Sequence, residues 1–327
     1  MNHRRKFIGA LGAVALQAPL GAMAQTATAA PRVVLLISSS MRTQSERVDA
    51  FRKRLRELGY TEGKNLIFEL RELDGKVDQL PAIMREIVQS NPAVIVTHGA
   101  GNQAARAATS TIPVVIAFTG NAVVEGLAVS LARPGGNFTG NTVIQSIAFE
   151  KNVEILHEII PKAARVGLLT NPQRKTHEAN KKLFEAAAAS RRLKAVILHA
   201  AGTQEIPKAF EQAVAQRVDM LVVSSNDTFS NEPKMVVDLA ARHRLPAIYS
   251  GDSFVAHGGL VFYGFSGAWL FGNAAVFVDR ILKGRKPAEL PFEQPTKFEM
   301  VVNMKTARAL GLTIPQSVLV RADRVIE

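Results

Sequence analysis

The chain has 327 residues, of which 47% are hydrophobic and 21% charged, a balance that excludes an intrinsically disordered protein. Its formal net charge is +12, but the basic residues are spread along helical segments such as 47–56, so we expect no nucleic-acid partner. The absence of cysteine excludes disulfides and a thiol nucleophile.

Residues 1–24 are predicted to be an export signal. Arg4 and Arg5 precede an uncharged run rich in glycine and alanine, which is too weakly apolar for a stable membrane span. The run ends in an A-x-A cleavage pattern, so we expect cleavage after Ala24 and a mature protein located in the periplasm. The paired arginines also fit a twin-arginine signal, so export by the Sec or the twin-arginine route stays open.

The segment after the signal alternates between short apolar runs and amphipathic stretches. A continuous apolar run at 33–37, bounded by three serines, is typical of a buried parallel strand. We predict strands at 33–37, 65–70, 93–97 and 114–118, and helices at 46–58, 77–89 and 102–109. A turn-rich passage at 133–137 then interrupts the alternation.

The same rhythm restarts after this passage. We predict helices at 149–160, 176–190, 206–215, 233–243 and 269–282, and strands at 165–170, 195–199, 219–224, 247–250, 259–263 and 298–302. Two successive series of alternating strands and helices predict an α/β protein with two doubly wound, parallel-sheet (Rossmann-like) lobes.

Parallel sheets of this kind bind ligands beyond the carboxyl ends of their strands. The loops at those ends are rich in serine, threonine, asparagine and aromatic residues, which suits a small polar organic ligand. Turns need the same residue types for structural reasons, so composition alone assigns no single residue. The candidate ligand-binding residues are Ser38, Ser39, Ser40, Thr97, His98, Gly99, Phe118, Thr119, Asn171, Asn226, Asp227, Thr228, Tyr249 and Ser250.

Two of these loops carry more specific signals. The helix predicted to begin after Thr97 offers free backbone N–H groups and the positive end of its dipole, which favour a carboxylate. Asp227 follows a buried strand, where its carboxylate could pair with the ammonium group of an amino acid. The same residue could instead cap the next helix, and both interpretations stay open at this point.

The sequence contains no pattern that predicts catalysis. The histidines lack metal-ligand spacing, and neither a G-x-S-x-G elbow nor a phosphate-binding loop is present. His98 and Asp227 could form an acid–base pair, but a single histidine in a binding cleft is more often a ligand contact. We therefore expect that the protein is not an enzyme and that it has no metal and no cofactor.

Three blocks of the chain resemble a large bacterial family. They lie at 124–140 (VEGLAVSLARPGGNFTG), 151–172 (KNVEILHEIIPKAARVGLLTNP) and 245–327, which begins LPAIYSGDSF. The family is the ABC-transporter substrate-binding proteins related to the tryptophan/tyrosine-type binding proteins. Its amino-acid-binding members have Asp-Asn-Thr in the loop where this chain has Asn-Asp-Thr-Phe at 226–229, so this loop departs from the family pattern.

The resemblance implies a type I periplasmic-binding fold, in which the chain crosses between the lobes three times. We expect these crossings near 140–145, 256–259 and 290–293. The implied division of the chain is 31–143 plus 258–290 for lobe one, and 144–257 plus 291–327 for lobe two.

The resemblance also implies a function. It predicts a monomeric periplasmic receptor that captures an amino acid or related carboxylate, aromatic ones included, between its lobes and delivers it to an inner-membrane ABC permease. Ligand would close the lobes by bending at the crossings, and the closed form without ligand should be a minority state. The alternatives are a periplasmic sensor subunit for a membrane signalling protein and an exported hydrolase.

Overall fold

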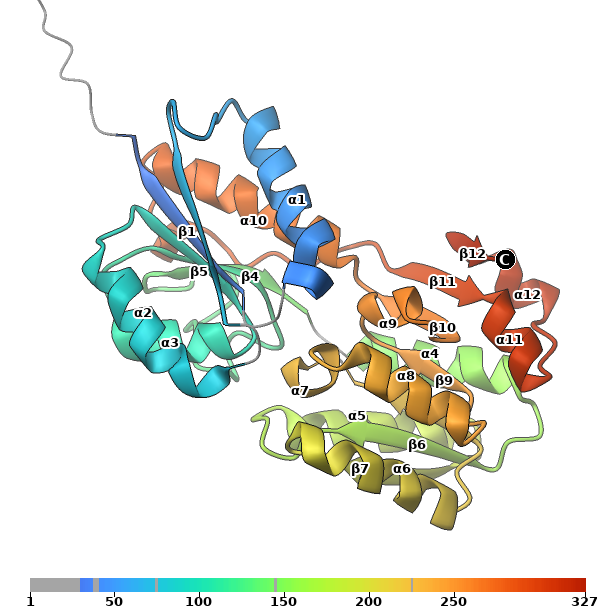
Figure 1. The fold of residues 1–327 in the computed structure, drawn as a ribbon. Helices are drawn as coiled ribbons and strands as arrows, with labels where there is room; N and C mark the ends of the chain where they lie inside the picture. The colour runs from blue at the N-terminus through green and yellow to red at the C-terminus, as the bar shows by residue number, and fades with distance from the viewer. Residues whose placement is uncertain (1–29, 38–40, 74–75, 144–145, 225) are drawn as a thin grey trace, which may run out of the picture.

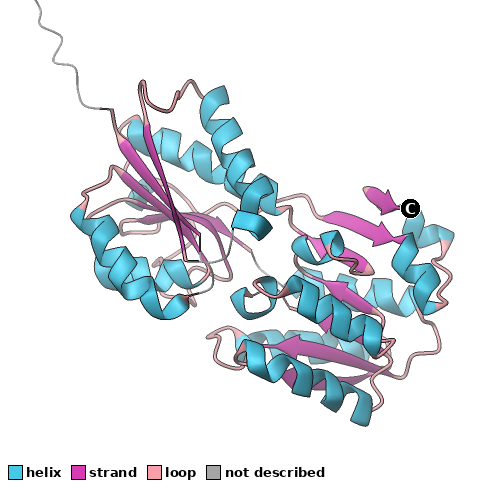
Figure 2. Ribbon diagram, in the orientation of Figure 1, coloured by secondary structure: helices cyan, strands magenta, loops and turns pink. Residues whose placement is uncertain are grey.

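The computed structural model describes residues 30–37, 41–73, 76–143, 146–224 and 226–327. Two α/β lobes lie beside each other, each built around its own sheet (Figure 1). Helices cover both faces of each sheet, as Figure 2 shows. Among the described residues, no helix is both long enough and apolar enough to cross a membrane. The predicted fold class, two doubly wound parallel-sheet lobes, is confirmed.

Lobe one contains a five-stranded, fully parallel sheet of order β2-β1-β3-β4-β5. Its strands are β1 (Arg32–Ile37), β2 (Ile67–Glu72), β3 (Val94–His98), β4 (Val114–Thr119) and β5 (Phe138–Thr142). Every residue of β1 after the first is buried, because helices cover both faces of this strand. This explains why the strand reads as an uninterrupted apolar run in the sequence.

Successive side chains of β1 pack against different helices. Val33, Leu35 and Ile37 belong to the core under α1 (Met41–Glu57) and α10 (Gly267–Leu282), whereas Val34 and Leu36 belong to the core under α2 (Leu80–Gln89) and α3 (Ala100–Ala108). Two short 3₁₀ helices, η1 (Val77–Gln79) and η3 (Pro287–Glu289), complete the lobe.

Lobe two contains a seven-stranded sheet of order β12-β11-β10-β9-β8-β6-β7. Its strands are β6 (Arg165–Thr170), β7 (Lys194–His199), β8 (Met220–Val223), β9 (Ala247–Tyr249), β10 (Val261–Gly264), β11 (Glu299–Asn303) and β12 (Arg324–Ile326). All neighbouring pairs are parallel except β10 and β11, which are antiparallel. The chain leaves this sheet after β10, forms α10 and η3, and then enters the sheet again in the opposite direction as β11.

The helices of lobe two pack in two groups. On one face, α4 (Ser146–Ile159) and α5 (His177–Ser190) share a core with α11 (Met304–Leu310) and α12 (Gln316–Leu319). On the other face, α6 (Ile206–Ala215) and α8 (Pro233–Arg242) share a second core with the short helices α7 (Asp227–Ser230) and α9 (Ser253–Ala256). The 3₁₀ helix η2 (Thr203–Glu205) precedes α6.

The position of β10 differs from the sequence-based division of the chain. Residues 258–290 were expected in lobe one, but β10 pairs with β9 in register Val261↔Ile248 and with β11 in register Val261↔Val302. This strand therefore extends the sheet of lobe two, and only α10 and η3 of that range pack on lobe one. The reason is local, because the short helix α9 returns the chain directly to a strand beside β9.

Strand β5 lies where no strand was predicted, and its end overlaps the crossing expected near 140–145. It reads FTGNT, which is polar, yet all five residues are buried. Thr139 donates a hydrogen bond to the carbonyl of Leu290 at 2.7 Å, and Asn141 donates to the carbonyls of Ala117 and Leu270 at 2.8 and 2.9 Å. These bonds satisfy the buried polar groups, so a polar sequence forms an interior strand beside the crossings.

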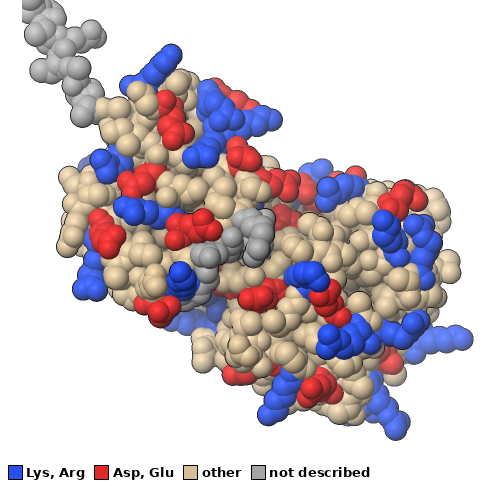
Figure 3. Space-filling view, viewed as in Figure 1, with Lys and Arg blue, Asp and Glu red and all other residues tan. Residues whose placement is uncertain are grey.

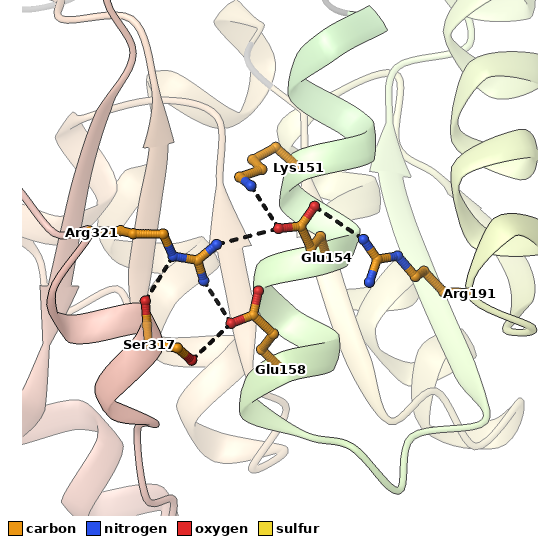
Figure 4. A network of polar contacts seen from close by, with 6 residues as sticks. All are labelled: Lys151, Glu154, Glu158, Arg191, Ser317 and Arg321. Carbon is orange, nitrogen blue, oxygen red and sulfur yellow. Dashed lines mark hydrogen bonds and ion pairs between the residues drawn. The ribbon is translucent and has the colours of Figure 1, made fainter.

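The C-terminal segment is fastened to α4 by a network of charged side chains (Figure 4). The guanidinium group of Arg321 donates to Glu154 at 3.3 Å and to Glu158 at 2.7 Å, and Glu158 also accepts from Ser317. Lys151 and Arg191 complete the charges around Glu154. The elements after β11 are thereby held against lobe two.

Basic and acidic side chains alternate over the face of the molecule drawn in Figure 3. Lysine and arginine occur on both lobes there and do not merge into a single stripe. On this face, the charge distribution is that of ordinary solvated helix surfaces.

Candidate functional site

A cavity of about 110 Å³ lies between the two lobes, at the carboxyl ends of strands from both sheets. This is less than the ~150 Å³ of a cavity that holds benzene, so a ligand larger than benzene needs a wider separation of the lobes. The lining residues are Arg47, Gly99, Phe118, Thr119, Gly120, Val143, Ala148, Phe149, Thr170, Arg174, Thr176, His177, Asn180, Ser224, Asn226, Asp227, Ser250, Gly251, Asp252, Gly264, Phe265, Gly267 and Leu270.

The cavity has an apolar part contributed by both lobes. Phe118 is the penultimate residue of β4 in lobe one, and Leu270 lies at the start of α10. Phe149 comes from α4 of lobe two, and Phe265 lies in the crossing between β10 and α10. An apolar surface with aromatic rings favours a ligand that carries an apolar or aromatic group.

Asp227 reaches across the cavity to lobe one. Its Oδ2 accepts a hydrogen bond from the backbone N–H of Ala100 at 2.7 Å, at the start of α3. The helix that Asp227 itself begins, α7, is capped by Asn226, whose side chain accepts from the N–H of Phe229. The carboxylate of Asp227 therefore caps a helix of the opposite lobe, and this N–H, which the sequence suggested for a ligand carboxylate, is already engaged.

A second carboxylate meets lobe one in the same manner. Asp252, which follows β9, accepts from the N–H of Gly267 at 2.8 Å, at the start of α10. It also forms an ion pair with Arg47 from α1. Burial would raise the pKa of Asp252, but the charge and hydrogen bonds of Arg47, together with backbone N–H donors, hold the pKa below its usual value. Asp252 is therefore ionised at neutral pH.

A third polar contact joins the lobes beside the cavity. Arg174, in the turn after β6, donates to Oε1 of Glu125 in lobe one at 3.1 Å. Gln103 of α3 donates to Oε2 of the same carboxylate at 3.2 Å and to the Glu125 carbonyl at 3.0 Å. The Glu125 side chain is only 6% exposed, and its two carboxylate oxygens accept from residues of both lobes.

His98 ends β3 directly behind the cavity wall. Its ring stacks on Phe118 at 5.3 Å between centroids and meets Phe271 edge-on at 5.4 Å. Burial lowers the pKa of His98 to about 4, an effect that the charge of Asp227 opposes and that of Arg47 reinforces. His98 is thus neutral at pH 7, and neither of its ring nitrogens has a hydrogen-bond partner in the described structure.

The structure brings six of the predicted ligand-binding residues to the cavity lining. They are Gly99, Phe118, Thr119, Asn226, Asp227 and Ser250. Among the described residues, five others lie behind the lining: Thr97, His98, Asn171, Thr228 and Tyr249. Ser38, Ser39 and Ser40 lie outside the part of the chain that is described.

Four of the residues behind the lining form contacts within the protein that support it. Thr97 forms a hydrogen bond with Asn102 of α3, and Asn171 donates to Thr228 at 2.9 Å. Tyr249 is 1% exposed and stacks on Phe254 at 4.8 Å, within the core under α8. At these positions, strand-end polar and aromatic residues support the loop rather than face the cavity.

Sequence reasoning missed several residues that line the cavity. Arg47 was interpreted as part of a solvated helix face, and Arg174, His177 and Asn180 lie beyond the strand end that was considered. Phe149 and Phe265 are in a helix and a crossing rather than in strand-end loops. The sequence pointed to Arg47 only indirectly. Its ion-pair partner, Asp252, follows a predicted strand and so lies near the expected ligand site.

The described residues contain no group of three or more histidine, cysteine, aspartate or glutamate side chains that could hold a metal ion. His177 and His199 meet edge to face with ring centroids 5.2 Å apart, and Thr170 and Glu178 lie 3.4 and 3.6 Å from ring nitrogens of His177. The residues that line the cavity offer a ligand hydrogen bonds, charges and apolar contact.

The profile of the family described as ABC transporter substrate binding protein matches residues 33–326. A tyrosine-binding protein of Clostridioides difficile (strain R20291) is 25% identical over 267 residues, which cover 80% of this chain and 75% of that protein.

Two solved structures have the same fold. A conserved domain protein from Vibrio cholerae O1 biovar El Tor has a TM-score of 0.84 at 27% identity, over 90% of this chain and 99% of that chain. An ABC domain in complex with L-Trp, from Streptococcus pneumonia, has a TM-score of 0.83 at 23% identity, with the same coverage. Since the family profile spans nearly the whole chain, this protein belongs to the ABC transporter substrate-binding proteins, a family of binding proteins rather than enzymes.

Proposed function

We propose that this protein captures a zwitterionic amino acid with an aromatic or other apolar side chain between its lobes and delivers it to an ABC permease. The observation that carries the proposal is the composition of the cavity lining. Two acids, Asp227 and Asp252, and two bases, Arg47 and Arg174, line the cavity together with apolar side chains.

The balance of charges in the lining favours a ligand without net charge. The lining has two carboxylates and two guanidinium groups, one of which, Arg174, is also paired with Glu125 outside the lining, so partners for both signs of charge are present and a dicarboxylate or a simple amine would use only one kind. A zwitterion brings both signs at once. Its ammonium group can approach an acid and its carboxylate a base, which satisfies both groups after water has left.

Asp227 is the residue that we assign to the ammonium group. A carboxylate can accept about four hydrogen bonds, so its bond with Ala100 leaves capacity for a ligand. The ligand carboxylate would then lie toward Arg174, with Thr170 and Ser250 as hydroxyl donors from lobe two.

The tyrosine-binding relative supports an amino acid as the ligand class, since it aligns with four-fifths of this chain. The rings of Phe118, Phe149 and Phe265 give physical support for an aromatic side chain, because offset and edge-on aromatic pairs add to the free energy of apolar burial. Although residues 226–229 depart from the family pattern, this loop still has a carboxylate, that of Asp227, in the cavity lining.

The proposed mechanism is lobe closure about three crossings. Following the sheets to which the strands belong, the lobe boundaries that we propose are 31–143 plus 267–290 for lobe one, and 146–266 plus 294–327 for lobe two. Ligand binds in the open cleft, and bending at the crossings buries it. The closed monomer in the periplasm would be the form that the permease recognises.

Calorimetric titration with three related compounds tests the proposal. L-Tyrosine carries both charges, 3-(4-hydroxyphenyl)propionate lacks the ammonium group, and tyramine lacks the carboxylate. We expect L-tyrosine to bind more tightly than either analogue by tenfold or more, because each analogue leaves one charged partner of the cavity unpaired. Equal binding of all three compounds, or binding of none, would contradict a zwitterion site of this kind.

The variant Asp227→Asn separates the role of Asp227 from general damage. The amide oxygen can still accept from Ala100, but the charge that pairs with an ammonium group is gone. We expect L-tyrosine to bind less tightly by about 2–5 kcal/mol, whereas 3-(4-hydroxyphenyl)propionate should lose little. Asp238→Asn, on the exposed face of α8, serves as the matched control and should leave both affinities unchanged.

A further inference from the structure

We propose that three direct contacts between the lobes form a latch that favours closure and thereby sets the affinity for ligand. The contacts are those of Asp227 with α3, of Asp252 with Arg47 and α10, and of Arg174 with Glu125. This proposal rests on the proposed function in one respect, since affinity has a meaning here only for a ligand held between the lobes.

The first contact places a lobe-two carboxylate on a lobe-one helix. Asp227 accepts from Ala100 at the first turn of α3, where the helix dipole adds to the attraction. The preceding residue is Gly99, and a Cβ atom there would overlap the carboxylate of Asp227. The approach is therefore possible only with glycine at this position.

The second contact repeats this arrangement at α10. Asp252 accepts from the N–H of Gly267, and a Cβ atom at Gly267 would overlap both Asp252 and Arg47. Arg47 adds an ion pair from α1, and it is oriented by a hydrogen bond to Gln44 at 3.0 Å. Two carboxylates of lobe two thus meet two helix N-termini of lobe one, each beside a glycine.

The third contact differs from the first two because its acid, Glu125, lies outside the cavity lining. Glu125 is held in lobe one by Gln103, and Arg174 reaches it from lobe two. Glu125 is not one of the residues that line the cavity. A change at Glu125 therefore alters ligand affinity without removing a residue of the lining, through closure and through the position of its partner Arg174.

The fraction of protein in the closed form determines the apparent affinity for ligand. The apparent dissociation constant equals the intrinsic one divided by the fraction of protein in the binding-competent form. A contact that favours the closed form therefore tightens binding even when it never touches the ligand. Because the Arg174–Glu125 and Arg47–Asp252 pairs are partly exposed, added salt should weaken them and shift the lobes toward the open form.

The cysteine-free chain permits a direct test without ligand. Gln89→Cys on α2 and Gln212→Cys on α6 place one spin label on each lobe at exposed positions. Pulsed electron–electron distance measurements then report the open and closed populations. We expect Arg174→Gln to lower the closed-to-open ratio roughly three- to tenfold, because Glu125 would otherwise stay buried without its partner.

Further variants distinguish the latch from unspecific effects. Glu125→Gln combined with Arg174→Gln should recover part of the closed population, since the unpaired charge is then removed. Lys234→Gln breaks an ion pair inside α8, at 2.6 Å from Asp238, and should leave the distances unchanged. Distance distributions that are the same in the wild type and all latch variants, at low and at high salt, would overturn the proposal.

The affinity measurement is kept separate from the distance measurement. With L-tyrosine as the probe, Glu125→Gln should weaken binding by about the same factor by which it lowers the closed fraction. An unchanged affinity alongside a reduced closed fraction would overturn the link between latch and affinity. If L-tyrosine does not bind the wild type, the ligand assignment fails, whereas the distances without ligand still decide whether the latch exists.

Discussion

Gly99 and Gly267 have the same role at the residue scale, since each leaves space for a carboxylate from the opposite lobe. Gly99 also has φ 58° and ψ −128°, a backbone conformation that residues with a Cβ atom rarely adopt. The tight approach of the two lobes therefore depends on positions where a side chain is absent. Each of these two contacts therefore requires both an acid in lobe two and a glycine in lobe one.

His98 provides a pH prediction at the same scale. Its native pKa of about 4 lies below the ordinary value of about 6.5, so between these values the unfolded chain binds more protons than the native protein. Stability is therefore unaffected by this group above pH 6.5 and falls as the pH drops from 6.5 toward 4, by up to about 3 kcal/mol.

The variant His98→Phe should remove this part of the pH dependence, because phenylalanine fits between Phe118 and Phe271 and does not titrate. Thermal unfolding between pH 7 and pH 4.5 measures the effect. The melting temperature of the wild type should fall more steeply than that of the variant. His257→Gln, at an exposed position, should follow the wild type, and parallel curves for wild type and His98→Phe would show that His98 does not titrate as described.

At the scale of elements, contacts of the polar strand β5 with α10 and Glu293 explain how the two lobes are joined. Asn141 of β5 accepts from Asn273 of α10 at 2.8 Å, and Asn273 also donates to Glu293 at 3.0 Å. The backbone of Glu293 in turn pairs with β5 through Gly140 and Thr142. The end of β5, the helix α10 and Glu293 therefore share one polar cluster.

The network around Glu154 yields a prediction for the C-terminal elements. Burial would raise the pKa of Glu154, but Lys151, Arg191 and Arg321 together hold it below its usual value. We expect Arg321→Ala to loosen residues 316–326 and to accelerate their amide hydrogen exchange. The loss of overall stability should be small, about 1 kcal/mol or less, because the network is partly exposed.

The pH dependence of this network has a defined sign. Because the native pKa of Glu154 is lowered, its contribution to stability is present above the ordinary pKa of glutamate and is lost as the pH falls through the lower native value. Arg324→Ala, at an exposed position of β12, is the control for Arg321→Ala. Equal exchange rates in the two variants would argue against the anchoring role of Arg321.

At the scale of the whole molecule, lobe closure predicts a change in shape. Small-angle scattering should give a smaller radius of gyration when L-tyrosine saturates the protein, because the lobes approach each other across the cavity. At the same ligand concentration, Asp227→Asn should compact less, since less of it is bound. A scattering curve that is unchanged by L-tyrosine, at a concentration where calorimetry shows binding, would contradict closure driven by ligand.

Export is the second prediction for the whole molecule. N-terminal sequencing of the periplasmic fraction should find Gln25 as the first residue, because the A-x-A pattern ends at Ala24. Changing Arg4 and Arg5 to lysine together should block export only if the twin-arginine route is used. An intact Met1 on protein recovered from the membrane would contradict the predicted cleavage.

The sequence by itself determined the local structure of this protein. The alternation of apolar runs and amphipathic stretches located most strands and helices, because each period reflects burial on one or both faces of that element. It also located six residues of the cavity lining, because strand ends in a parallel sheet meet at one edge. The polar strand β5 was missed, since its burial depends on partners from elsewhere in the chain.

Only the tertiary structure decided which residues meet. Asp227 and Ala100 are 127 positions apart, and Arg47 and Asp252 are 205 positions apart, so no local pattern could pair them. Sheet order assigned β10 to lobe two, and the approach of the lobes placed Arg47 in the cavity. The physical reason is that local periodicity records how much of an element is buried, whereas the identity of its partner depends on how separate sheets and lobes pack together.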